Sequence, residues 1–135
     1  MGGYMAQDYI GGSNSEAKMF KAQILMGSAL NRDKHSIQQD GSTLFNYKAP
    51  TLTIGGTKDG FTRISRVAES YWHQVKNINA SQKNLFPIVE LDGVSHAQFA
   101  NTNIPSTVKD GDLKPDVTLE VAHSLTGHAI ATYLH

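Results

Sequence analysis

The segment Pro50-Thr51-Leu52-Thr53-Ile54-Gly55-Gly56-Thr57-Lys58-Asp59-Gly60 decides how this chain folds. Residues 49–54 are apolar and β-branched, which predicts a buried strand. Pro50 suits the start of a strand, because its missing N–H is not needed there. The glycines that follow predict a tight loop over 55–60. The pattern is therefore a buried strand that runs into a glycine-rich loop carrying Asp59.

Two further apolar segments predict strands before and after this one. Residues 22–27 form a compact apolar stretch, and residues 86–91 form another that ends at Asp92-Gly93. Strands that alternate with helices are typical of a parallel sheet. We therefore expect an α/β fold of three layers, in which a parallel sheet of about three strands is flanked by helices.

Helical periodicity is clearest over 61–76. A short helix is also expected over 4–10 and a final one over about 116–134, with a long loop over about 101–115 between the third strand and that helix. Apolar residues that recur at three- and four-residue spacing within 61–76 are expected to face the core: Phe61, Ile64, Ala68, Tyr71, Trp72 and Val75.

Length and composition exclude several classes of protein and of site. Its 135 residues suit a single domain over 1–135. Twelve Lys and Arg balance twelve Asp and Glu, so no basic surface for a nucleic acid is expected. No apolar run is long enough for a transmembrane helix, the first residues lack a signal-peptide pattern, and nothing assigns a compartment. The absence of Cys excludes a cysteine nucleophile and a Cys-based zinc site.

Two residues that can carry acid–base chemistry follow neighbouring strands. Catalytic groups in parallel sheets gather at the carboxyl ends of the strands, and Asp59 and His96 each come just after one. An Asp that accepts from one ring nitrogen fixes the tautomer of a His, while the other nitrogen acts as a base. Singly, such an Asp is more often a turn former and such a His a surface residue. The pair in this order predicts an acid–base site.

Three segments resemble the α/β-hydrolase family, in the order in which that family has them. Residues 1–9, Met-Gly-Gly-Tyr-Met-Ala-Gln-Asp-Tyr, look like the segment just after the nucleophilic serine of the family's Gly-x-Ser-x-Gly elbow. Residues 50–60 are similar to its seventh strand and acid loop, and residues 86–96 to its eighth strand and histidine loop. The resemblance covers nearly the whole chain and is to serine esterases and lipase-like enzymes.

This resemblance implies roles for particular residues. Asp59 would be the acid and His96 the base of a triad that hydrolyses a small ester or related acyl substrate, without a cofactor. Met1 would supply a backbone N–H to the oxyanion hole. The nucleophile is not in this sequence, so the chain corresponds to the C-terminal half of such an enzyme and is expected to be inactive by itself.

Other residues are expected around the same pocket. Ser28, at the end of the first strand, would border it, and Gln98 and Phe99 would line it because they lie close to His96 in sequence. The family that the chain resembles often has a lid inserted before the strand that corresponds to 50–54, so the resemblance implies a small or absent lid over the short segment 31–48. Self-association is also expected, through an exposed sheet edge at the first strand, where a missing strand would pair.

A different class of function stays open from the sequence. The chain could be a noncatalytic α/β binding module whose glycine-rich loop over 55–60 holds a small anionic ligand, or an inactive truncated relative of the hydrolases. No metal site is expected, because His123 and His128 fall on different sides of the final helix.

Overall fold

The computed structural model describes residues 2–11, 19–30, 49–76, 78–100 and 104–135. Within these residues the chain builds a parallel sheet of three strands, in the order β1-β2-β3. The strands are β1 (Gln23–Met26), β2 (Thr51–Gly56) and β3 (Ile88–Leu91).

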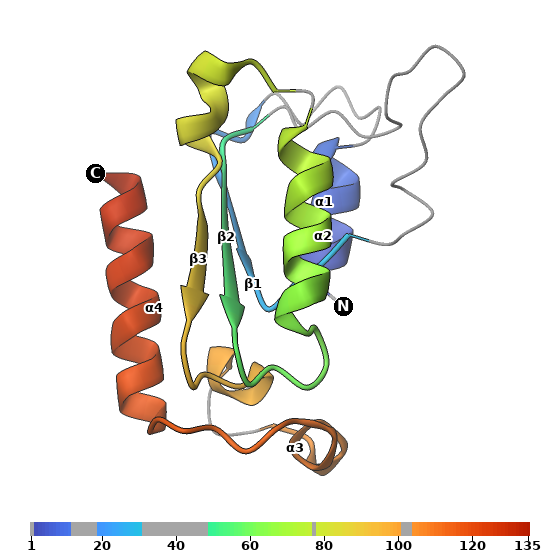
Figure 1. The fold of residues 1–135 in the computed structure, drawn as a ribbon, viewed down its shortest axis with the longest axis vertical. Helices are drawn as coiled ribbons and strands as arrows, with labels where there is room; N and C mark the ends of the chain where they lie inside the picture. The colour runs from blue at the N-terminus through green and yellow to red at the C-terminus, as the bar shows by residue number, and fades with distance from the viewer. Residues whose placement is uncertain (1, 12–18, 31–48, 77, 101–103) are drawn as a thin grey trace.

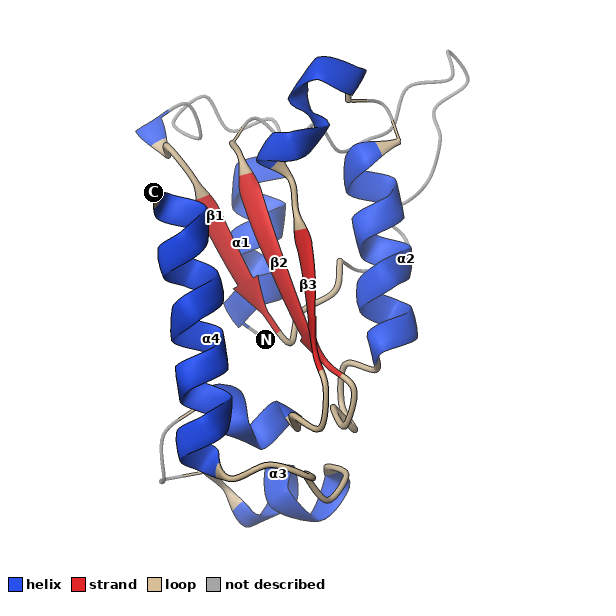
Figure 2. Cartoon of the chain, turned by 60° about the vertical axis from the view of Figure 1, so that its left-hand side comes forward, coloured by secondary structure: helices blue, strands red, loops and turns tan. Residues whose placement is uncertain are grey.

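Helices cover both faces of this sheet, which confirms the expected α/β class with three layers. Figures 1 and 2 show α1 (Gly2–Gly11) and α2 (Ile64–Val75) on one face and α4 (Leu119–Leu134) on the other. Shorter helical turns lie at the ends of the strands. They are η3 (Ala80–Leu85), η4 (His96–Phe99) and α3 (Ser106–Gly111).

The alternation of β2 explains why both faces are covered. Successive side chains of a strand point to opposite faces, so Leu52 and Ile54 share one face while Thr51 and Thr53 share the other. Leu52 and Ile54 are buried in an apolar cluster that includes Ala122 of α4. The two threonines are equally buried, and Thr53 Oγ1 donates to Oε1 of Gln74 in α2 at 3.4 Å.

The predicted apolar stripe of α2 is wrong in part. Trp72 is 61% exposed, Phe61 is 50% exposed and Ala68 is exposed, whereas α2 buries Val67, Ser70, Gln74 and Val75. The helix is turned so that polar Ser70 and Gln74 are buried together with the two valines against the face of the sheet that carries Thr51 and Thr53. The absence of a side chain at Gly55 of β2 lets α2 approach the sheet, since a Cβ there would lie 2.7 Å from Cδ1 of Ile64.

Three boundaries also differ from those expected. β2 continues through Gly55 and Gly56, so the loop begins at residue 57. The long loop contains α3 among its described residues. The last helix begins at Leu119, because the side chain of Thr118 caps it by accepting from the N–H of Val121 at 3.3 Å.

β1 lies at an edge of the described sheet, as expected, since it pairs with β2 alone. Self-association through this edge stays a prediction. Of the helices that the structure describes, none combines the length and apolar character needed to cross a bilayer.

Candidate active site

The loops that follow β2 and β3 leave the same edge of the sheet. Parallel pairing aligns Gly56 with Leu91, the last residue of each strand. The N–H of Thr57 donates to the carbonyl of Leu91 at 3.1 Å, and the N–H of Lys58 donates to that of Val94 at 2.9 Å. These bonds bring the segment that carries Asp59 alongside the one that leads to His96.

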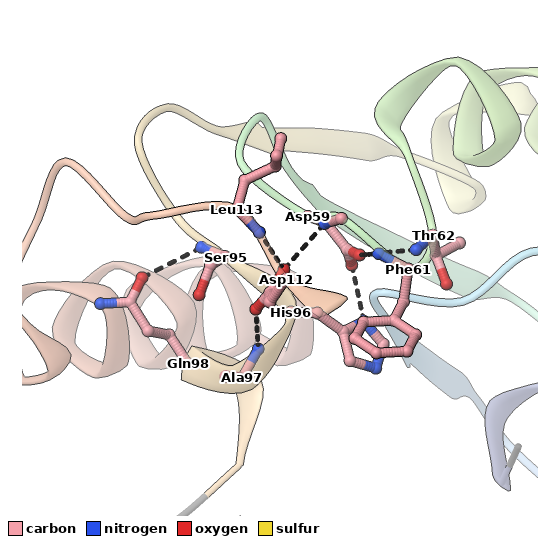
Figure 3. Close-up of polar contacts among 10 residues, drawn as sticks. Asp59, Phe61, Thr62, Ser95, His96, Ala97, Gln98, Asp112 and Leu113 are labelled. Atoms are coloured by element: carbon pink, nitrogen blue, oxygen red, sulfur yellow. Dashed lines mark hydrogen bonds and ion pairs between the residues drawn. The ribbon is translucent and has the colours of Figure 1, made fainter. Parts of the chain in front are cut away.

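Asp59 is a buried carboxylate that is fully oriented by its neighbours. It is 1% exposed, and Oδ1 accepts from the N–H groups of Phe61 at 2.9 Å and Thr62 at 2.6 Å. Oδ2 lies 2.7 Å from Nδ1 of His96 (Figure 3). Because an ionised carboxylate only accepts, Nδ1 carries the proton in this contact, which leaves Nε2 as the basic nitrogen of the neutral ring.

The environment of His96 favours its charged form. The hydrogen bond to Asp59 raises the pKa of His96 above its ordinary value of 6.5, although burial acts in the opposite direction, and the charges of Asp59 and Asp112 raise it further. The side chain of His96 is 31% exposed, so it is reachable from solvent. The ring of Phe61 covers one side of it, with ring centroids 5.4 Å apart.

Gly27, which the sequence argument did not single out, makes room for this pair. It follows β1 with a φ of 52°, in the left-handed region that favours glycine. A Cβ there would lie 2.9 Å from Oδ2 of Asp59, 2.9 Å from Cδ2 of Phe99 and 3.0 Å from Nδ1 of His96. The end of β1 therefore borders the site, and a glycine at the carboxyl end of a buried strand is the signal that could have found it.

The first turn of α1 lies against the same end of β1. A Cβ on Gly3 would lie 2.4 Å from Oγ of Ser28, so these two residues are in close contact. The hydroxyl of Ser28 is buried and accepts from Nε2 of Gln7 at 3.1 Å. Ser28 thus lies next to Gly27 at the edge of the site, and its hydroxyl bonds to α1.

The other three residues predicted for the site, which are Phe99, Gln98 and Met1, do not all lie beside the Asp59–His96 pair. Phe99 lies beside the pair, as its approach to Gly27 shows. Gln98 is buried and braces the histidine loop, since its Oε1 accepts from the N–H of Ser95 at 3.0 Å and its Nε2 donates to the carbonyl of Val117 at 2.8 Å. Met1 lies outside the described residues.

The glycine-rich segment does not form an open cradle for an anion. The N–H groups of Thr57 and Lys58 are bonded to carbonyls of the histidine loop, that of Asp59 to the carbonyl of Gly56 at 3.2 Å, and that of Gly60 to Asp112 at 2.8 Å. With its donors already used, this segment gives no support to an anion-binding module. The loops instead hold the imidazole of His96 in a fixed orientation at the edge of the sheet where β2 and β3 end.

Comparison of the chain with known protein families, with curated proteins and with solved structures gave no match. The function is therefore inferred from the site itself.

Proposed function

We propose that Asp59 and His96 are the acid and the base of a serine-hydrolase triad, and that this chain is the C-terminal half of an α/β-hydrolase acting on an ester or related acyl bond. The observation that carries the proposal is the 2.7 Å contact between Oδ2 of Asp59 and Nδ1 of His96 at the carboxyl ends of two parallel strands. The resemblance of residues 50–60 and 86–96 to the family's acid and histidine loops supports the same assignment.

The geometry of the pair suits one sequence of proton transfers. The serine hydroxyl attacks the acyl carbon while its proton passes to Nε2 of His96, and Asp59 stabilises the imidazolium that forms. The imidazolium then gives the proton to the leaving alkoxide, which departs as an alcohol. A water molecule repeats the cycle on the acyl-enzyme, with His96 again taking and returning one proton.

The position of α1 fits a nucleophile supplied from a segment before Met1. In the family that the chain resembles, the serine comes immediately before the helix that corresponds to α1, and here the first turn of α1 packs on Ser28, the neighbour of Gly27. A serine in that place would lie at the same edge of the sheet as His96. In the family that the chain resembles, the residue in the place of Met1 supplies a backbone N–H to the oxyanion hole.

Ser28 does not suit the role of nucleophile, because its hydroxyl is buried and bonded to Gln7. We therefore expect the 135-residue chain to show no turnover of p-nitrophenyl esters above the buffer rate. Turnover by this chain that disappears in His96→Ala would contradict the placement of the nucleophile outside it.

The positive test uses the chain extended by the coding sequence that precedes Met1 in the same reading frame. The extended protein should hydrolyse p-nitrophenyl esters, and His96→Ala or Asp59→Asn should lower kcat by about three to four powers of ten. The matched control is His128→Ala, which changes an exposed histidine of α4. Equal activity in the His96 and His128 variants, or no serine in the preceding frame, would overturn the proposal.

A further inference from the structure

A second carboxylate, that of Asp112, joins the two loops of the site. It comes directly after α3, and the side chain reaches between the segments that carry Asp59 and His96 (Figure 3). Oδ1 accepts from the N–H of Gly60 at 2.8 Å, and Oδ2 accepts from the N–H of Ala97 at 2.7 Å. Each of these donors belongs to the residue that directly follows one member of the pair.

The backbone of Gly60 also packs closely against residues 111 and 112. A Cβ on Gly60 would lie 2.6 Å from the carbonyl oxygen of Gly111 and 2.8 Å from Cα of Asp112. The N–H of Leu113 adds a third bond to Oδ1 at 3.0 Å. The side chain of Asp112 thus joins the segment after Asp59 to the segment after His96.

Asp112 holds these bonds as an anion. Burial alone would raise the pKa of Asp112, but the N–H groups of Ala97 and Gly60 and the hydroxyl of Ser95 stabilise the carboxylate, and the net pKa lies below the ordinary value of 3.8. Hydrogen bonds to a charged acceptor are stronger than those between neutral groups. The hydrogen bonds of Asp112 with Gly60 and Ala97 are therefore charge-assisted throughout the neutral pH range.

We propose that Asp112 is a positioning residue that holds the Asp59 loop and the His96 loop in register, so that the hydrogen bond between Asp59 and His96 depends on it. This inference rests on the proposed function, because it gives Asp112 a role in the same acid–base pair. Asp112 acts through the backbone of Gly60 and Ala97 and is not expected to touch the substrate.

The test compares Asp112→Asn with Asp116→Asn in the full chain by NMR titration of the His96 ring. Asn keeps the shape of Asp112 but turns an amide N–H₂ toward a backbone donor and removes the charge. We expect the pKa of His96 to fall by about 0.5–1 pH unit in Asp112→Asn, part of which is the loss of the Asp112 charge itself. The positioning role also requires the Nδ1 proton of His96 to exchange faster with solvent in Asp112→Asn, because its hydrogen bond to Asp59 is weakened. An Nδ1 proton as protected as in the unsubstituted chain would overturn the positioning role. The control Asp116, whose side chain is 61% exposed and pairs with Lys58, should change it by less than about 0.2 unit.

Amide hydrogen exchange provides a second measurement that needs no variant. The N–H groups of Gly60 and Ala97 should be protected in the unsubstituted chain, because both donate to Asp112. Exchange of both at the rates of an unfolded peptide would overturn the inference, even if Asp112→Asn does not fold. So would a folded Asp112→Asn variant in which His96 titrates as it does in the unsubstituted chain.

Asp59→Asn separates failure of this inference from failure of the proposed function. If Asp59→Asn lowers the pKa of His96 and Asp112→Asn does not, the positioning role of Asp112 is wrong and the acid–base pair stands. If neither changes it, the pair itself is not formed, and both proposals fall.

Discussion

The two faces of the sheet both bury apolar clusters, but one of them also buries a network of polar side chains. On the face covered by α4, Leu52 and Ile54 pack in an apolar cluster with Ala122. On the face covered by α1 and α2, a second apolar cluster of Leu30, Val75 and Phe86 lies beside buried polar side chains that are hydrogen-bonded around Gln7. Apolar contacts stabilise without fixing direction, whereas hydrogen bonds fix both distance and orientation.

The face with the polar network carries α1 and α2, whose first residues lie near the site. Gln7 of α1 is fully buried, and its side chain donates to Ser28 and accepts from Gln74 of α2 at 3.4 Å and from Ser70 at 3.5 Å. The N–H of Leu30 donates to Oγ of Ser70 at 2.8 Å, which ties the segment after β1 to α2. We infer that the apolar clusters on the two faces supply most of the stability, while the hydrogen bonds around Gln7 set the positions of α1 and α2 beside the acid–base pair.

The largest expected effect comes from disrupting the apolar cluster on the α4 face. Leu52→Ala removes a side chain that is 1% exposed, and the free energy of unfolding should fall by about 2–5 kcal/mol. Urea denaturation of this variant and of Leu134→Ala, which removes an exposed side chain of α4, provides the comparison. A loss below about 1 kcal/mol in Leu52→Ala would mean that this cluster does not hold the fold.

A smaller effect is expected from removing the buried hydrogen bonds around Gln7. Gln7→Ala leaves the side chains of Ser28, Ser70 and Gln74 without this partner, and the free energy of unfolding should fall by about 1–3 kcal/mol. Met5→Ala is the matched control, because Met5 lies on the same helix and is 63% exposed. If Gln7→Ala destabilises the chain more than Leu52→Ala does, the proposed division between the apolar clusters and the hydrogen bonds around Gln7 is wrong.

The order of strands and helices could be predicted because it depends on local patterns. The alternation in residues 51–54 and the glycines after them are visible in the sequence. Asp59 and His96 could be paired before the structure was seen, because parallel strands bring their carboxyl ends to one edge.

The rest depends on partners distant in the chain. The orientation of α2 was missed because Gln74 is buried against Gln7, 67 positions earlier, and a periodicity argument assumes that only apolar residues face inward. Asp112 was missed for the same reason, since its partner Gly60 lies 52 positions away. Gly27 was not singled out because only the assembled site shows that a side chain there would meet Asp59 and His96.

The most direct test of the central claim is a titration of the His96 ring by two-dimensional ¹H–¹⁵N NMR, in the unsubstituted chain and in Asp59→Asn. We expect a proton on Nδ1 of the neutral ring and a pKa above 6.5, because the carboxylate of Asp59 stabilises the imidazolium. In Asp59→Asn the pKa should fall by about one unit or more. A pKa of His96 at its ordinary value that does not respond to Asp59→Asn would contradict the claim that these two side chains form an acid–base pair.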